Sequence, residues 1–247
     1  MSDLTKDGYR VFPFEARVAD WARAAHAAAI KVCKTTGDLR HGKTWRVGVD
    51  ELPNEADGSI SGVALAGAWR EHVTAPAAWH AAQLSVIYPG YPQQDTDESD
   101  AAHGFRLNRD AAHVDGLLPE GPHKQRHLRE PHQFVLGISL NEATASPLVI
   151  WPQSHKMIKA AFADAFAGID PAHWGDQDVT EIYKDVRRTV FQTCPRVEVH
   201  AKVGEAVLVD RHLLHGVAPW GDGTAPSEGR MIAYFRPLVA DTADWLA

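Results

Sequence analysis

Cysteine is almost absent from this chain of 247 residues. The two cysteines, Cys33 and Cys194, are far apart and match no redox or metal-binding motif. This excludes a disulfide framework and is typical of a reducing compartment, so we predict a cytoplasmic location. Long apolar runs are also missing, and the polar residues 1–8 do not resemble a signal peptide, so no membrane partner is expected.

The chain also lacks an excess of basic residues and the signatures of several enzyme classes. Its net charge is −7 and its pI is about 6.0, which argues against a nucleic-acid partner. It has no P-loop, no dinucleotide-binding fingerprint, no His-Glu-x-x-His motif and no Gly-x-Ser-x-Gly motif. If the protein is an enzyme, its chemistry must come from other residues.

The chain has enough apolar sequence for one large domain, and several of its segments are periodic. Helical spacing marks residues 14–36, 65–72, 157–166 and 180–191, and strand patterns mark residues 81–88, 134–140, 148–151, 197–203, 206–209 and 231–235. No repeat or linker divides the sequence. We therefore predict a single domain over residues 1–247, mainly β with flanking helices (α+β), whose strands form a barrel or sandwich.

Two polar segments have open interpretations. Residues 92–104 are acidic and rich in turn-forming residues, and they form either a solvated loop or a mobile lid beside a site. Residues 122–132 are basic within an acidic chain. They form either a loop that holds an anionic group of a substrate or a solvated loop that pairs with nearby acids.

The most informative feature is the tripeptide His113-Val114-Asp115. In a strand, the side chains of residues i and i+2 point the same way, so His113 and Asp115 can present a nitrogen and an oxygen to one ion. A second histidine, His215, ends an apolar strand far along the chain. Two imidazoles and one carboxylate are the ligands with which non-haem Fe(II) oxygenases hold one face of their metal. Alone, His-x-Asp is a weak signal among 14 histidines.

An arginine follows this constellation. Arg230 opens the strand at residues 231–235, and its planar guanidinium suits bidentate capture of a carboxylate. Arg236 lies on the same face of that strand and is the second candidate, although a salt bridge at the rim of the barrel is the more ordinary role. His212 also lies near His215, but three residues apart on a strand the two face opposite ways.

From residue 83 to residue 237 the order of motifs resembles the Fe(II)/2-oxoglutarate-dependent dioxygenases of the phytanoyl-CoA dioxygenase-like family. That family has a strand with a glutamine, a His-x-Asp pair, a Pro-Gly-Ser-His turn, a Gly-Asp turn before an apolar strand, a distal histidine and an arginine. The corresponding segments here are Gln83 to Gly90, His113-Val-Asp115, Trp151-Pro-Gln-Ser-His155, Gly204-Glu205 to His215, and Arg230.

The resemblance implies a double-stranded β-helix (jelly-roll, cupin-like) core at about residues 81–240, with N-terminal helices at about 14–80 packed on it. It implies three catalytic residues that bind iron, namely His113, Asp115 and His215. It also implies that Arg230 and Gln83 bind the cosubstrate 2-oxoglutarate. With O2, such an enzyme would hydroxylate a small-molecule substrate and release succinate and CO2.

The chain departs from the family pattern at several positions, among them Gln153, Val217 and Trp220, so phytanoyl-CoA itself is not the expected substrate. Trp151, His155 and Trp220 could line the pocket, or they could be packing and helix-start residues. A metal-dependent hydrolase and a non-catalytic, cupin-like binding protein are alternatives that would use the same three ligands. The expected partner is a small molecule, anionic if the basic loop holds it, and the protein is expected to be a monomer or a homodimer.

Overall fold

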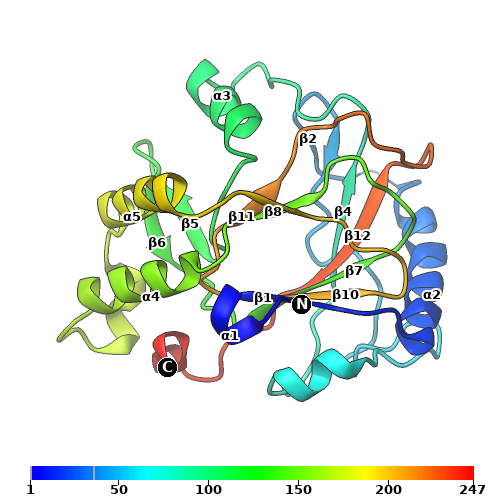
Figure 1. The fold of residues 1–247 in the computed structure, drawn as a ribbon, viewed down its shortest axis with the longest axis horizontal. Helices are drawn as coiled ribbons and strands as arrows, with labels where there is room; N and C mark the ends of the chain where they lie inside the picture. The colour runs from blue at the N-terminus through cyan, green and yellow to red at the C-terminus, as the bar shows by residue number, and fades with distance from the viewer. Residues whose placement is uncertain (1, 36) are drawn as a thin grey trace.

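Antiparallel strands make up the centre of the protein (Figure 1). The computed structural model describes residues 2–35 and 37–247. One sheet has the strand order β1-β10-β7-β12-β4-β3-β2, and a smaller sheet has the order β11-β8-β9. Strands β5 and β6 form a hairpin. Most neighbours are far apart in the sequence, except for β2 and β3, which follow one another. These long connections are typical of a jelly roll and differ from those of a simple meander.

The elements have the following bounds. The large sheet contains β1 (Tyr9–Phe12), β2 (Leu39–Arg40), β3 (Trp45–Arg46), β4 (Gln83–Ile87), β7 (Phe134–Ser139), β10 (Ala206–Asp210) and β12 (Arg230–Phe235). The small sheet contains β8 (Leu148–Ile150), β9 (Val197–Val199) and β11 (His215–Val217), and the hairpin contains β5 (Leu117–Glu120) and β6 (Gln125–Leu128). The helices are α1 (Leu4–Asp7), α2 (Ala16–Val32), α3 (Asp100–Asn108), α4 (Ser154–Ala165) and α5 (Thr180–Thr193), with 3-10 helices η1 (Ala68–His72), η2 (Pro171–Asp176) and η3 (Thr242–Leu246).

Side chains alternate along the central strands of the large sheet. On β7, Leu136 belongs to a buried hydrophobic cluster while its neighbour Gly137 lines a cavity on the opposite face. On β12, Phe235 belongs to the same cluster and Tyr234 lines the cavity. This is the period of two that a strand imposes on its side chains. The large sheet therefore has one face against a core and one face toward a cavity.

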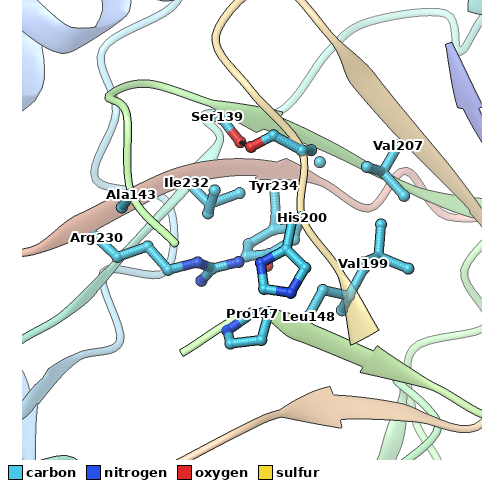
Figure 2. A pocket seen from close by; sticks show the side chains of 12 residues that line it. Ser139, Ala143, Pro147, Leu148, Val199, His200, Val207, Arg230, Ile232 and Tyr234 are labelled. Carbon is cyan, nitrogen blue, oxygen red and sulfur yellow. Dashed lines mark hydrogen bonds between the residues drawn. The ribbon is translucent and has the colours of Figure 1, made fainter. Parts of the chain in front are cut away.

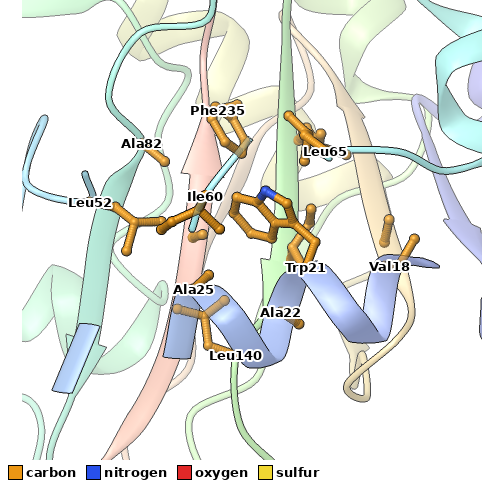
Figure 3. Close-up of a cluster of buried hydrophobic side chains, with 14 of the residues drawn as sticks. Val18, Trp21, Ala22, Ala25, Leu52, Ile60, Leu65, Ala82, Leu140 and Phe235 are labelled. Carbon is orange, nitrogen blue, oxygen red and sulfur yellow. The ribbon is translucent and has the colours of Figure 1, made fainter. Parts of the chain in front are cut away.

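Helix α2 covers the core face of the large sheet (Figure 3). Trp21, Ala25 and Ala29 recur every four residues and are fully buried, which is the helical spacing that the sequence predicts. The Trp21 ring lies 5.6 Å from the Phe235 ring, and its indole Nε1–H donates to the Gly58 carbonyl oxygen at 2.9 Å. The alanines leave room for the helix to approach the sheet closely.

Helices α4 and α5 form a second layer, away from α2 (Figure 1). They enclose another hydrophobic cluster, in which Phe162 and Trp245 are fully buried. Val114, the residue between His113 and Asp115, belongs to this cluster. The helices thus pack directly against the segment that carries the His-x-Asp pair.

Several elements differ from the sequence-based predictions. Residues 65–72 contain only the 3-10 helix η1, and the strand predicted at 197–203 ends at Val199 because the chain turns at residues 202–205. The part at 14–80 is not only helical, since β2 and β3 extend the large sheet beside β4. Helix α3 and the β5–β6 hairpin were not predicted. None of the helices within residues 2–35 and 37–247 is long and apolar enough to cross a membrane.

Candidate metal centre

His113 and His215 are direct partners in an antiparallel pairing. Each backbone N–H donates to the carbonyl oxygen of the other residue, at 2.7 and 3.0 Å. This pairing puts the two imidazoles side by side, with ring centroids 4.8 Å apart. Asp115 Oδ1 lies 3.2 Å from His113 Nε2, and Asp115 Oδ2 lies 3.7 Å from His215 Nε2. The three residues thus each offer one ligand atom within 4.8 Å of the others.

The hydrogen bonds of the two imidazoles set which nitrogen is free. His113 Nδ1–H donates to the Ala111 carbonyl oxygen at 2.9 Å, and His215 Nδ1–H donates to the Leu213 carbonyl oxygen at 2.9 Å. Both rings therefore use the same local bond, to the carbonyl two residues earlier. This turns each Nε2 toward Asp115 and leaves it without a backbone partner, which is how histidines are oriented as metal ligands.

Burial and nearby charges shift the pKa values of His215 and Asp115 toward the protonation states that bind a metal. Burial lowers the pKa of His215, which keeps its imidazole neutral, the form that binds a metal. Burial alone would raise the pKa of Asp115. The hydrogen bond with His113 and the positive charge of Arg236 outweigh that effect and hold the Asp115 pKa well below its usual range. The site therefore presents an ionised carboxylate.

The segment before the His-x-Asp pair is held by side chains from distant elements. Asp110 is buried and accepts two hydrogen bonds from Arg196, from Nε at 2.7 Å and from Nη2 at 2.8 Å. The backbone N–H of Val114 donates to the Tyr183 hydroxyl oxygen at 2.9 Å. Gly116 follows with φ +83°, and a Cβ there would collide with the Glu130 carbonyl oxygen. These contacts fix the chain on both sides of the pair.

The segment before His215 has a similar support. Ser154, the first residue of α4, is fully buried, and its hydroxyl oxygen accepts a hydrogen bond from the Leu214 backbone N–H at 2.9 Å. The preceding Gln153 has φ +70°, a left-handed conformation that glycine adopts most easily.

The three residues border a cavity of about 190 Å³ between the two sheets. Its walls are mostly apolar and come from β3, β7, β8, β10 and β11; they include Trp45, Val47, Val135, Leu148, Val207, Val209 and Val217. Its polar lining includes Gln83, Ser85, Tyr234 and Arg236. A mostly apolar cavity with few polar groups beside a cluster of titratable side chains is typical of a small-molecule site.

Arg230 lies in an adjoining cavity, which shares Gly137, Leu148, Val207 and Tyr234 with the first (Figure 2). Figure 2 shows its side chain reaching toward Tyr234 and His200. Arg230 is only 6% exposed, and its Nη1 is buried without a hydrogen-bond partner. No carboxylate of the described residues lies within 4.0 Å of its guanidinium. A buried guanidinium without an acidic partner is placed to receive an anion.

Gln83, on β4, lines the cavity of the His-Asp-His cluster. Its side-chain Nε2 donates to the Val47 carbonyl oxygen at 2.9 Å, which fixes the orientation of the amide. Gln83 is therefore held in the wall of the cavity, with the Nε2 already engaged by the backbone.

Known proteins match this chain in fold and not in sequence. No family model and no curated protein sequence matches it. The non-heme α-ketoglutarate-dependent carbocyclase SnoK from nogalamycin biosynthesis is similar, with a TM-score of 0.52 and 13% identity over 95% of this chain and 81% of that chain. The chain has the fold of a non-heme α-ketoglutarate-dependent enzyme. The predicted fold class is confirmed.

Two further structures show the same fold. The epimerase SnoN, in complex with Fe3+, α-ketoglutarate and nogalamycin RO, has a TM-score of 0.50 and 15% identity over 96% of this chain and 81% of that chain. EvdMO1 has a TM-score of 0.50 and 16% identity over 96% of this chain, but this chain spans only 48% of EvdMO1.

Other residues singled out in the sequence have more ordinary places in this fold. Trp151 packs against Phe191, with ring centroids 5.3 Å apart, and His155 lies by the backbone of α1. His212 is buried beside Trp245, with ring centroids 4.5 Å apart. Trp220 does not line either of the two cavities described above. Of these four residues, none lines the cavity of the cluster.

The acidic segment at 92–104 does not form a simple loop. Asp95 accepts hydrogen bonds from the backbone N–H groups of His41 and Gly42, at 2.7 Å each, and α3 begins at Asp100. His41 in turn stacks on Trp45, with ring centroids 5.7 Å apart. The segment thus packs on the β2–β3 hairpin behind a cavity wall. Sequence reasoning missed Trp45, whose two-residue strand has no periodic pattern.

Proposed function

We propose that this protein is an Fe(II)- and 2-oxoglutarate-dependent oxygenase of a small-molecule substrate. The observation that carries the proposal is the pair of imidazoles with Nδ1–H bonded to the backbone and Nε2 turned to one ionised carboxylate. Such a set holds one face of iron and leaves positions open for other ligands. His113, Asp115 and His215 would hold the metal.

Bound there with 2-oxoglutarate and O2, iron supplies the oxidative decarboxylation of 2-oxoglutarate to succinate and CO2, coupled to oxidation of a substrate C–H bond. The protein contributes geometry and the exclusion of water. The valine-rich walls offer bound water few hydrogen-bond partners, and a substrate that displaces the water would strengthen electrostatic interactions inside the cavity.

Arg230 would bind the far carboxylate of 2-oxoglutarate. Its guanidinium is buried without an acidic partner, in a cavity that adjoins that of the His-Asp-His cluster. Because the two cavities share lining residues, among them Gly137 and Tyr234, the cosubstrate would extend from the cluster toward Arg230. Gln83 would contribute through the second N–H of its Nε2, because the first donates to the Val47 carbonyl oxygen and the cosubstrate offers only acceptor oxygens.

Hydroxylation is the reaction we propose, and the tests should also detect other oxidative outcomes such as cyclisation and epimerisation. SnoK and SnoN, which share the fold, are named as a carbocyclase and an epimerase. Substrate screening by mass spectrometry should therefore record a gained oxygen, a loss of two hydrogens and an unchanged mass. Succinate formation is the readout common to all three.

The experiment that tests the proposal uses the purified protein without air. Fe(II) and 2-oxoglutarate together should give a weak visible charge-transfer band, and admission of O2 should then give succinate, even without a substrate. The Asp115→Ala variant should give neither signal. A protein that binds Fe(II) but gives no band and no succinate would instead fit a non-catalytic binding protein. Hydrolysis supported equally by Zn(II) would favour the hydrolase alternative.

A further inference from the structure

Arg236 has a backbone held by two histidine rings. Its N–H donates to His80 Nε2 at 2.8 Å, and its carbonyl oxygen accepts from His132 Nδ1–H at 2.9 Å. The Nδ1–H of His80 donates to the Ala81 carbonyl oxygen at 2.7 Å, which leaves Nε2 as the acceptor. Two side chains from different segments therefore fix the point from which the arginine side chain leaves the end of β12.

The guanidinium of Arg236 lies beside the proposed metal ligands, and its close acidic partner among the described residues is Asp115 itself. Its Nη1 is 3.7 Å from Asp115 Oδ1, and its Nε is buried without a hydrogen-bond partner. Glu130, a nearby acid, lies 3.3 Å from His132 Nε2. Asp115 is assigned to iron, and no second carboxylate of the described residues lies within 4.0 Å of the Arg236 guanidinium.

Arg236 also differs from Arg230 in its access to solvent. The Arg236 side chain is 18% exposed, whereas Arg230 is 6% exposed as a residue. Val49, which lines the same cavity as Arg236, is 51% exposed and marks the open side. Asp50, the next residue, lies 3.4 Å from His80, which holds the Arg236 backbone. A molecule that enters from solvent therefore meets Arg236 beside the proposed metal ligands.

We propose that Arg236 binds a carboxylate of the primary substrate, so that the substrate class is a small carboxylic acid with an apolar body. This inference rests on the proposed function. Among the described residues, Arg236 is the one lysine or arginine that lines the cavity of the His-Asp-His cluster, and the other walls are mainly valine and tryptophan. A guanidinium donates two parallel hydrogen bonds to a carboxylate, while apolar walls select the rest of the molecule. Arg230 is left to bind the far carboxylate of the cosubstrate. Its Cα lies about 20 Å along the strand from the Cα of Arg236.

The test uses carboxylic acids with about five to ten carbons, straight-chain and phenyl-substituted, each paired with its primary amide. Succinate formation by wild-type protein without any of these compounds is measured first, because it tests the proposed function alone. Each compound is then titrated for stimulation of succinate formation and, without O2, for its shift of the charge-transfer band. Acids should act at concentrations at least about tenfold lower than their amides.

The Arg236→Gln variant should lose this preference for acids, while its requirement for 2-oxoglutarate changes less than about threefold. Arg236→Lys should keep part of the preference, since a point charge remains. Arg188→Gln, on the exposed face of α5, is the matched control and should behave as wild type. Iron content and thermal melting confirm that each variant is folded.

Three outcomes would overturn the inference while leaving an oxygenase in place. The acid-to-amide ratio could be the same in Arg236→Gln as in wild type. The variant could instead raise the 2-oxoglutarate requirement, which would move Arg236 to the cosubstrate. Finally, wild-type protein that forms succinate but responds to none of the acids would show that the substrate class is wrong.

Discussion

The two sheets that enclose the cavity are stabilised in different ways. The large sheet has strands of four to six residues in β1, β4, β7, β10 and β12, and its outer face packs on α2. The small sheet has strands of three residues, and the segments near it that carry the proposed metal ligands are held by a few side chains, such as Arg196 on Asp110 and Tyr183 on Val114. The difference suggests a division of roles, with stability in the large sheet and site geometry in the small one.

The largest expected effect is on the small-sheet side. Asp115→Ala should remove iron binding and nearly all succinate formation. Loss of a residue that only hydrogen-bonds a metal ligand typically costs roughly 10–100-fold, and loss of a ligand should cost more. Metal analysis and a succinate assay measure the two effects. Asp185→Ala, at an exposed pair on α5, is the control. Substantial turnover by Asp115→Ala would remove this residue from the metal site.

A substitution in the core beside the large sheet should lower the stability of the protein without changing iron binding. Trp21→Ala empties a fully buried position under α2 and should cost about 3–5 kcal/mol in the free energy of unfolding. The folded fraction should still bind iron with wild-type affinity. Urea unfolding and iron titration test this, with Phe14→Ala, at a site 64% exposed, as the control. Loss of iron affinity in the folded fraction would contradict the division of roles.

Arg230 tests whether the large sheet also contributes to binding. Arg230→Gln should raise the 2-oxoglutarate requirement by at least about 30-fold, because truncating one partner of a buried charge pair costs about 2–5 kcal/mol. Iron affinity should stay the same. Titration of succinate formation against 2-oxoglutarate measures the change, beside Arg236→Gln, for which a small change is expected. An unchanged requirement would leave Arg230 as a structural residue.

The difference between the large sheet and the segments near the small sheet also explains which parts of the structure could be predicted from the sequence. Apolar runs of strand length at residues 134–140 and 231–235 predicted β7 and β12, whereas β1, β2 and β3 of the same sheet were not predicted. The local spacing of His113 and Asp115 was also accessible. The fold prediction rested further on the order of motifs between residues 83 and 237.

Contacts between segments that are distant in the sequence could not be predicted from local patterns. The wall residue Trp45 lies on a two-residue strand, and its place depends on the Asp95 contacts to the β2–β3 turn. The histidines at 80 and 132 hold Arg236 from segments distant in the sequence, so nothing in their local pattern marks them. Helix α3 had a local signal, since Ser99 is its N-cap, but the surrounding acidic run favoured a loop.

The smallest effect we predict falls at the contact between α5 and the metal segment. Tyr183→Phe removes the acceptor of the Val114 backbone N–H in a buried place, which should cost about 1–3 kcal/mol in stability. Because Val114 lies between His113 and Asp115, iron affinity should also fall by about tenfold. Thermal melting and iron titration measure both, with Tyr9→Phe on β1 of the large sheet as the control. If stability falls but iron affinity does not, the proposed metal ligands are held in place without this hydrogen bond. The geometry of the site would then not depend on this single contact, contrary to the division of roles between the two sheets.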